Sequence, residues 1–447
     1  MLIQQSFAGS RSTSEVPIPS EMVQTASNNR PGDRRFLLWV ILVALAIRLI
    51  VVAFVYESYL DPGRNHWEFG YEGGQVAGSI VQGHGFGNLF RVPSGPTASM
   101  GPIMPYLLAG VMEVFGLYTK ASAIVILSLN SLFSALTCLP IFFVAKQTLG
   151  LRVARWSSWG WALYPYAVNF SANSMWDHAL MGLLVTLIFW ISYSMDEKRG
   201  LCAWAGFGCL WGVAGLTNAV VFGVLPFLGG WIWYRLLQKK ARWLLPAATA
   251  GLALLVTITP WMIRNIRTFH QPVFLKNNYW LAILSGNAGD PLHWLGNDSP
   301  GRDSREMAEY LRVGEIQYMA EKKVEAIQFI KQNTGLFVLR SIRRFVFMWT
   351  GFWSLNPEYL KMEPFDIPNI PLCTAITVFA ILGLRRAFHN DVEIAIPYAI
   401  MLILFPLGYY PTHPELSYRQ SWDPEIVILV CYALTGLRRF SPRPKSA

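Results

Sequence analysis

The stretch HWEFGYEGGQVAGSIVQGHGF, residues 66–86, follows the first long apolar segment of the chain and combines carboxylates with a short amphipathic helix. Glu68 and Glu72 therefore stand where a membrane span should give way to water. A carboxylate close to lipid headgroups is costly unless it has a partner or a function. The stretch predicts an active site at a membrane surface.

The composition indicates a polytopic integral membrane protein with an all-α fold. Hydrophobic residues make up 53% of the 447 residues and charged residues only 14%, which is not typical of a soluble domain. The net charge is +10, but the basic residues are dispersed at the ends of apolar segments. No basic patch for a nucleic acid is present. The five cysteines lie in apolar segments without metal-ligand spacing, which argues against disulfides and zinc.

Apolar segments long enough to cross a membrane recur along the chain. They cover residues 36–56, 121–145, 156–170, 177–195, 202–216, 219–234, 243–262, 370–384, 394–410 and 425–437, with a shorter segment at 102–116. Lys and Arg accumulate in alternate loops between them, and such loops face the cytoplasm. We therefore expect both termini in the cytoplasm and about ten crossings of the plasma membrane, with roughly eleven to thirteen as the alternative because short segments that contain proline are ambiguous.

This orientation gives an organisation in five parts. The sequence predicts a disordered cytoplasmic tail (1–35), a transmembrane core (36–262), an extracytoplasmic segment (263–368), C-terminal transmembrane helices (369–440) and a second cytoplasmic tail (441–447). The first outer loop (57–100) belongs to the core. Apolar residues recur at helical spacing among charges in residues 303–332, which predicts helices on the membrane face. Residues 337–353 combine arginines with aromatic residues, as interfacial helices do.

Several motifs in order along the chain resemble those of the GT-C glycosyltransferases, in particular the protein mannosyltransferase and aminoarabinose transferase type and a bacterial branch of that superfamily. The motifs begin within the acidic first outer loop and span most of the chain. They are AxxxxxGxGF (77–86), GPT (95–97), GPIMPYLLA (101–109), LNSLFSALT (129–137), PWMIRN (260–265), SGN (285–287) and YYPTHPELSYRQSWDP (409–424).

The resemblance implies a GT-C helical bundle that transfers a sugar from a polyprenyl-phosphate carrier to an acceptor on the outer face of the membrane. The donor would be a polyprenyl-phosphate sugar, and the acceptor a glycan, lipid or protein. Such enzymes usually invert the anomeric centre and use no nucleotide-sugar. No nucleic acid is expected as a partner.

The chain departs from the family pattern in its first loop. Many relatives have an adjacent acidic pair there, whereas here Glu68 lies nine residues and Glu72 five residues before Ala77. Glu72 opens the predicted helix, where the helix dipole would keep its carboxylate ionised. We therefore expect Glu72 to be the catalytic base, with Glu68 as the alternative. The competing interpretation is that Glu72 only caps the helix.

Asp177 is the third candidate acid, because it starts a predicted span at the outer face, where relatives also carry an acid. It would orient the acceptor or the base. As an alternative, Glu72 and Asp177 could together bind a divalent metal. A purely electrostatic role for Asp177 at the start of a helix is equally consistent with the sequence.

Transfer also needs groups that hold the departing phosphate and the sugar. The arginine fork suits phosphate oxygens, which makes Arg264 and Arg419 candidates. Tyr418 and His413 lie in the same loop as Arg419, and Asn287 offers an amide for sugar hydroxyls. Arginines at membrane surfaces also serve as lipid anchors, and His413 fits an ordinary turn.

Two other functions use the same features. A lipid-linked oligosaccharide ligase or polymerase would need a lipid-diphosphate donor and more arginine at the site. A transporter or flippase would place ionisable groups in the middle of broken helices, often in repeated halves. No internal repeat is visible, and the candidate acids lie at span ends. The sequence therefore favours the glycosyltransferase.

Overall fold

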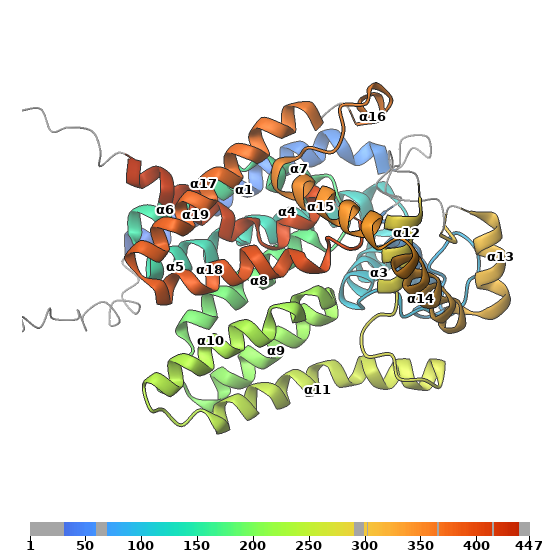
Figure 1. Cartoon of the computed structure of the whole chain (residues 1–447), viewed down its shortest axis with the longest axis horizontal. Helices are drawn as coiled ribbons and strands as arrows, with labels where there is room; N and C mark the ends of the chain where they lie inside the picture. The colour runs from blue at the N-terminus through green and yellow to red at the C-terminus, as the bar shows by residue number, and fades with distance from the viewer. Residues whose placement is uncertain are drawn as a thin grey trace, which may run out of the picture.

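The protein is almost entirely helical, as the computed structural model of its residues 31–59, 69–289, 299–301, 303–363, 366–413 and 415–437 shows (Figure 1). Within these residues, extended pairing is limited to one isolated bridge between Gly87 and Pro96. The predicted all-α class is therefore confirmed.

The first part of the chain forms a helical bundle in which α1 packs against α4 and α7, α2 against α3, and α5 against α6. Its helices are α1 (Pro31–Val55), α2 (Glu72–Val81), α3 (Ile103–Phe115), α4 (Lys120–Leu136), α5 (Cys138–Thr148), α6 (Leu151–Ala162), α7 (Pro165–Ala172) and α8 (His178–Ser194).

The next three helices lie along one side of this bundle, at the bottom of Figure 1. They are α9 (Leu201–Thr217), α10 (Leu225–Gln238) and α11 (Leu244–Phe269). Helix α9 packs along α11, and the two backbones come so close at Gly208 that a Cβ atom there would clash with the Ala250 carbonyl. Small residues at such crossings are characteristic of membrane helix pairs.

The middle of the chain forms a group of helices of which α12, α13 and α14 lie at one end of the molecule, on the right of Figure 1. The group comprises α12 (Tyr279–Ala288), α13 (Ser304–Val313), α14 (Glu315–Gln332), α15 (Thr334–Thr350) and α16 (Pro357–Met362). The amphipathic spacing of residues 303–332 thus forms two helices. They are separated at Gly314, whose φ of 80° ends α13.

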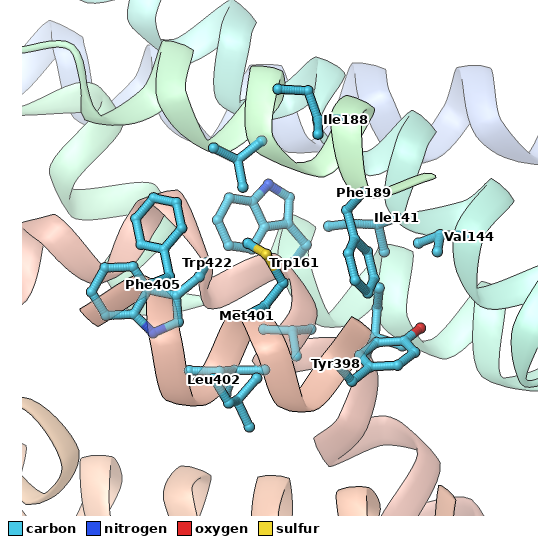
Figure 2. Packing of buried hydrophobic residues seen from close by; sticks show 14 of the residues in the cluster. Ile141, Val144, Trp161, Ile188, Phe189, Tyr398, Met401, Leu402, Phe405 and Trp422 are labelled. Carbon is cyan, nitrogen blue, oxygen red and sulfur yellow. The ribbon is translucent and has the colours of Figure 1, made fainter. Parts of the chain in front are cut away.

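The last helices return to the bundle: α17 (Asp366–Asn390), α18 (Val392–Leu404), the 3-10 helix η5 (Leu416–Ser421) and α19 (Asp423–Leu437). Helix α19 packs against α17 and α6. Large side chains from α6, α8, α18 and the residue between η5 and α19 meet in the main core, including Trp161, Phe189, Tyr398 and Trp422 (Figure 2). This core ties the end of the chain to its first half.

Four helices in the described part of the chain are long and apolar enough to cross a membrane: α1, α11, α17 and the α4–α5 pair. Much of their apolar surface faces outward. On α11, for example, Leu252 and Val256 are each 64% exposed. Apolar surface of this extent is unfavourable in water and favourable in lipid. The protein is therefore an integral membrane protein.

Two of the predicted spans are interrupted. The segment 156–170 divides into α6 and α7 because Pro165, at the start of α7, cannot continue the hydrogen bonding of the preceding turn. The segment 219–234 begins with a 3-10 turn, where the Asn218 side chain accepts a hydrogen bond from the backbone N–H of Val220. Apolar composition alone did not reveal either break.

The first helix begins earlier than expected, at Pro31 inside the predicted tail 1–35. Asp33, in its first turn, is buried and forms ion pairs with Lys146 at 2.9 Å and Arg155 at 3.4 Å. These partners come from α5 and α6, more than a hundred residues away. Residues 31–35 are therefore ordered by tertiary contacts that the local sequence does not contain.

Candidate active site

Two predicted acids lie on loops that pack against each other. Glu72 is the first residue of α2, and Asp177 immediately precedes α8. The backbone of Gly70, which has a φ of 88°, lies so close to Met175 that a Cβ atom there would be 3.1 Å from the Met175 carbonyl oxygen. Asn130 of α4 holds the second loop, donating to the Ser174 carbonyl at 2.7 Å.

The backbone just before Glu72 is strained. Phe69, Gly70 and Tyr71 have consecutive φ angles of 58°, 88° and 48°, and side chains other than glycine rarely adopt such values. Phe69 is buried, with its ring 5.3 Å from that of Tyr118, and the Tyr71 hydroxyl donates to the Gly301 carbonyl at 3.3 Å. Strain of this kind costs about 1–3 kcal/mol per residue and is concentrated at functional sites.

Lys276, in the loop that follows α11, lies within electrostatic range of both acids. Burial lowers the pKa of Lys276, while the negative charges of Asp177 and Glu72 act in the opposite direction. Asp177 also accepts a hydrogen bond from Asn218 at 3.2 Å. Three charged groups from distant parts of the chain thus share one electrostatic environment. Sequence reasoning missed Lys276, because a single lysine in a polar loop carries no distinguishing pattern.

Tyr418 and His413 form one wall of this site. The His413 Nε2 atom and the Tyr418 hydroxyl are hydrogen-bonded at 2.6 Å, and the ring centroids of Tyr418 and His178 lie 5.5 Å apart. Burial raises the pKa of Tyr418, and the carboxylates of Glu415, Asp177 and Glu72 act in the same direction. Tyr418 and His413 therefore lie close to the two acids, as aromatic and imidazole groups that can contact a sugar.

Arg419 points away from this wall into the protein. It is 2% exposed, donates from Nε to Asp423 at 3.1 Å and from Nη1 to the Met348 carbonyl at 3.0 Å. These contacts join η5 to α19 and α15. The phosphate-binding role expected for Arg419 stays a prediction. Its contacts fix the position of η5 and, with it, of the neighbouring Tyr418.

Arg264 and Asn287 connect the walls of the site. Arg264 donates to the backbone carbonyls of Phe86 at 2.6 Å and Thr97 at 2.7 Å, and so holds both sides of the turn at residues 87–96 in the first outer loop. Asn287 is fully buried and donates to the Pro411 carbonyl at 2.8 Å. Their predicted contacts with substrate also stay predictions. Glu68 lies outside the described residues.

Glu315 connects several distant segments through hydrogen bonds, a role that the sequence did not reveal. Its carboxylate accepts hydrogen bonds from Thr97 (2.5 Å), the backbone N–H of Ala98 (2.7 Å), Asn277 (2.9 Å) and Tyr310 (2.9 Å). It thereby ties α14 to the first outer loop and to the loop that carries Lys276. A buried acid within an amphipathic helix looks like any surface glutamate in sequence.

The divalent metal that Glu72 and Asp177 could share stays a prediction. Within the described ranges, no cluster of three or more His, Cys, Asp or Glu side chains is suitable as a metal site. Glu72 and Asp177 also lie within electrostatic range of the Lys276 ammonium group, which supplies a positive charge.

The protein resembles known proteins in its three-dimensional structure. No family model matches the sequence, and no curated protein matches it. The archaeal oligosaccharyltransferase AglB from Archaeoglobus fulgidus, in complex with an inhibitory peptide and a dolichol-phosphate, aligns with a TM-score of 0.52 and 14% identity. The alignment covers 94% of this chain and 53% of that chain.

The apo form of the Archaeoglobus fulgidus oligosaccharyltransferase aligns with a TM-score of 0.54 and 13% identity, over 90% of this chain and 50% of that chain. ArnT from Cupriavidus metallidurans, bound to undecaprenyl phosphate, aligns with a TM-score of 0.38 and 13% identity. That alignment covers 90% of this chain and 78% of the ArnT chain. The chain thus spans about half the length of the oligosaccharyltransferases it matches. It has the GT-C fold of membrane glycosyltransferases.

Proposed function

We propose that this protein is a membrane glycosyltransferase that moves a sugar from a polyprenyl-phosphate-linked donor to a hydroxyl of a glycan, lipid or protein acceptor. The reaction would take place on the extracytoplasmic face of the plasma membrane. The observation that carries the proposal is that the loops carrying Glu72 and Asp177 pack against each other, at Gly70 and Met175, with Lys276 in electrostatic range of both acids. The AglB structure that shares the fold was solved with a dolichol-phosphate, which supports a lipid-phosphate donor.

The proposed step needs one base and one group that stabilises the leaving phosphate. The acceptor hydroxyl oxygen attacks the anomeric carbon, and its proton passes to the Glu72 carboxylate. The bond between the anomeric carbon and the phosphate oxygen breaks, and the electron pair leaves with the lipid phosphate. Lys276 offers a positive charge to that phosphate, and Asp177 orients the acceptor. Positioned groups of this kind lower the barrier by matching charge that develops in the transition state.

The role of each residue in this step follows from its place in the structure. Glu72 opens α2, where the helix dipole favours its ionised form, so it is the better base. Glu68 is the alternative base from the same loop. Tyr418 and His413 would contact the sugar. Arg264, Arg419 and Asn287 are held in contacts with protein groups and would shape the walls.

The test is transfer by the purified full-length protein in nanodiscs, with a short-chain polyprenyl-phosphate sugar as donor and an extract of membrane glycans and lipids as acceptor. We expect Glu72→Gln to lower turnover by about a hundredfold or more, the usual contribution of a general base. Glu113→Gln, an exposed acid on α3, is the matched control.

Thermal unfolding of each variant separates loss of chemistry from loss of fold. Normal turnover in Glu72→Gln with loss in Glu68→Gln would move the role to Glu68. Normal turnover in both variants would remove the first outer loop from catalysis.

A further inference from the structure

Helix α1 presents an apolar outer side along the half that leads to the first outer loop. Leu49, Ile50 and Phe54 are 38%, 59% and 82% exposed. Because α1 is long and apolar enough to cross a membrane, these side chains lie against lipid. Helix α1 packs against α4, so a seam between two membrane helices borders this lipid-facing side.

A groove of about 290 Å³ lies in this seam, and we call it the α1–α4 groove. One face of each helix forms its lining: Leu49, Val52, Ala53 and Tyr56 from α1 and the adjoining 3-10 helix η2 (Tyr56–Tyr59), and Ile124 and Ser128 from α4. Ile124 and Ser128 are one helical turn apart, and Lys120 lies one turn before Ile124 on the same face. From Lys120 to Ser128 this face extends over about 12 Å. Tyr56 and Lys120 stand at the end nearest the first outer loop.

The lining of the α1–α4 groove is suited to a hydrocarbon chain. Its polar side-chain atoms are the hydroxyls of Tyr56 and Ser128, and the other side chains are aliphatic. An empty apolar space loses the dispersion contacts that its walls would otherwise make, and water gains few hydrogen bonds there. A flexible acyl chain from the surrounding bilayer supplies those contacts. The occupant expected from the lining is therefore one chain of a membrane lipid.

Two opposite charges stand at the mouth of the groove. The Tyr56 hydroxyl donates to Glu57 Oε1 at 3.0 Å, and the Lys120 Nζ atom lies 4.8 Å from the centroid of the Tyr56 ring. The Glu57 carboxylate is within electrostatic range of the Lys120 ammonium group. Both side chains are exposed, so a lipid head that enters the mouth meets one cation and one anion arranged around Tyr56.

This pair of charges selects among the common phospholipid heads. Phosphatidylglycerol offers a phosphate to Lys120 but places its negative charge beside Glu57. Phosphatidylcholine adds a positive charge, yet its quaternary ammonium has no N–H to donate. Phosphatidylethanolamine carries a phosphate for Lys120 and a primary ammonium group whose N–H groups can donate to the Glu57 carboxylate. Hydrogen bonds between charged groups are shorter and stronger than neutral ones, so charge complementarity favours the ethanolamine head.

We propose that the α1–α4 groove binds a phospholipid whose zwitterionic head carries a phosphate and a primary ammonium group, with one acyl chain between α1 and α4. The proposal does not depend on the proposed function. The bound lipid has a structural consequence, because Val52 belongs to the same hydrophobic cluster as Phe69 and Met175. Phe69 precedes Glu72 and Met175 precedes Asp177 in the two packed loops. A chain in the groove therefore supports the cluster that holds both loops.

The experiment measures lipid binding to the full-length protein, purified in detergent, by native mass spectrometry. The probes are phosphatidylethanolamine, its N-methyl and N,N-dimethyl derivatives, phosphatidylcholine and phosphatidylglycerol, all with dioleoyl chains. We expect phosphatidylethanolamine to bind at least about fivefold tighter than phosphatidylcholine, the net effect of one hydrogen bond. Affinity should fall at each methylation, as one donor after another is lost, and phosphatidylglycerol should also bind more weakly. Equal affinity for all of the probes would overturn the assignment of the head group.

Two variants test the mouth of the groove. Glu57→Gln removes the negative charge that the ammonium group meets, and should abolish the preference for phosphatidylethanolamine over phosphatidylcholine. Lys120→Gln removes the cation, and should weaken the binding of every phospholipid by about fivefold. Glu321→Gln on α14 is the control, because Glu321 pairs with Gln317 of the same helix, and it should keep the wild-type selectivity. An unchanged preference in Glu57→Gln would overturn the proposal.

A second pair of variants tests the groove itself. Ser128→Phe fills the groove with a ring and should lower the affinity for all of the lipids by about tenfold, whereas Ser128→Ala leaves the groove open and should bind as the wild type does. Thermal unfolding shows whether each variant is folded, and the mouth variants decide the question if Ser128→Phe is not. Undiminished lipid binding by folded Ser128→Phe would place the lipid elsewhere and overturn the proposal. Wild-type dimers without bound lipid would also overturn it, by assigning the groove to a second copy of the chain.

Discussion

Lys276 is the residue whose role depends most directly on protonation. It carries a positive charge only below its pKa, which burial lowers from the ordinary value of 10.5. If this charge binds the donor phosphate, binding is present at low pH and is lost as the pH rises through that lowered pKa. As the pH rises, we expect the affinity for farnesyl phosphate to fall at a lower pH than it would with an exposed lysine, whose pKa is 10.5.

The variants of Lys276 make this expectation specific. In Lys276→Arg the side chain stays charged at every accessible pH, so the decline with pH should disappear. In Lys276→Gln the affinity should be low throughout. Lys323→Gln, an exposed lysine on α14, should behave like the wild type. An identical pH profile in the wild type and in Lys276→Arg would show that Lys276 does not hold the phosphate.

The buried arginines illustrate a second point at the scale of residues. Arg48, in the middle of α1, is fully buried and donates to Ser134 and to the carbonyls of Ala44, Ala162 and Trp161. Those contacts join three helices and leave Arg48 a structural residue. Arg344 likewise donates to the carbonyls of Tyr410 and Gly286 and to Asn287 Oδ1, and so joins α15 to α12 and to the segment before η5. Burial alone therefore does not identify a ligand-binding arginine.

At the scale of elements, the site depends on how α14 is attached. Glu315 receives four hydrogen bonds from the first outer loop, the Lys276 loop and α13. We expect Glu315→Gln to lower the free energy of unfolding by at least about 2 kcal/mol, because the amide has one acceptor oxygen where the carboxylate has two charged ones. Transfer should fall with it, because Lys276 and the first loop lose their common anchor.

The measurement is denaturant unfolding in detergent, together with limited proteolysis of the outer helices. Faster cleavage within α13 and α14 should accompany the loss of stability. Glu321→Gln on the same helix is the matched control, since Glu321 accepts a single hydrogen bond from Gln317. Equal stability in the two variants would show that Glu315 does not connect these elements.

At the scale of the whole molecule, α11 sets the orientation of the site. Its 26 residues extend over about 39 Å, which places Lys240 and Lys276 near opposite membrane faces. We expect a reporter fused after Lys240 to be cytoplasmic and one fused after Asn297 to be extracytoplasmic, as the distribution of basic residues predicts. Alkaline phosphatase and green fluorescent protein fusions would check both positions. A reversed pair would place the acids on the cytoplasmic face.

Much of the architecture follows from the sequence because membrane insertion is a local property. Long apolar segments and alternating basic loops predicted the helical class and most of the helices. Glu72 and Asp177 stay predicted site residues, and the sequence singled them out because acids at the ends of apolar segments are rare. The breaks at Pro165 and Asn218, by contrast, depend on single residues within segments of uniformly apolar composition.

The tertiary structure decided which polar groups meet. Lys276 reaches Glu72 and Asp177, and Arg344 lies beside Tyr410, only because segments far apart in sequence fold together. Arg264 and Arg419, whose phosphate-binding roles stay predictions, have protein partners that the sequence did not indicate. Sequence determines where polar side chains occur along each helix through hydrophobic periodicity. Which of them are paired with each other and which are left for a ligand is set by long-range packing, which no local pattern encodes.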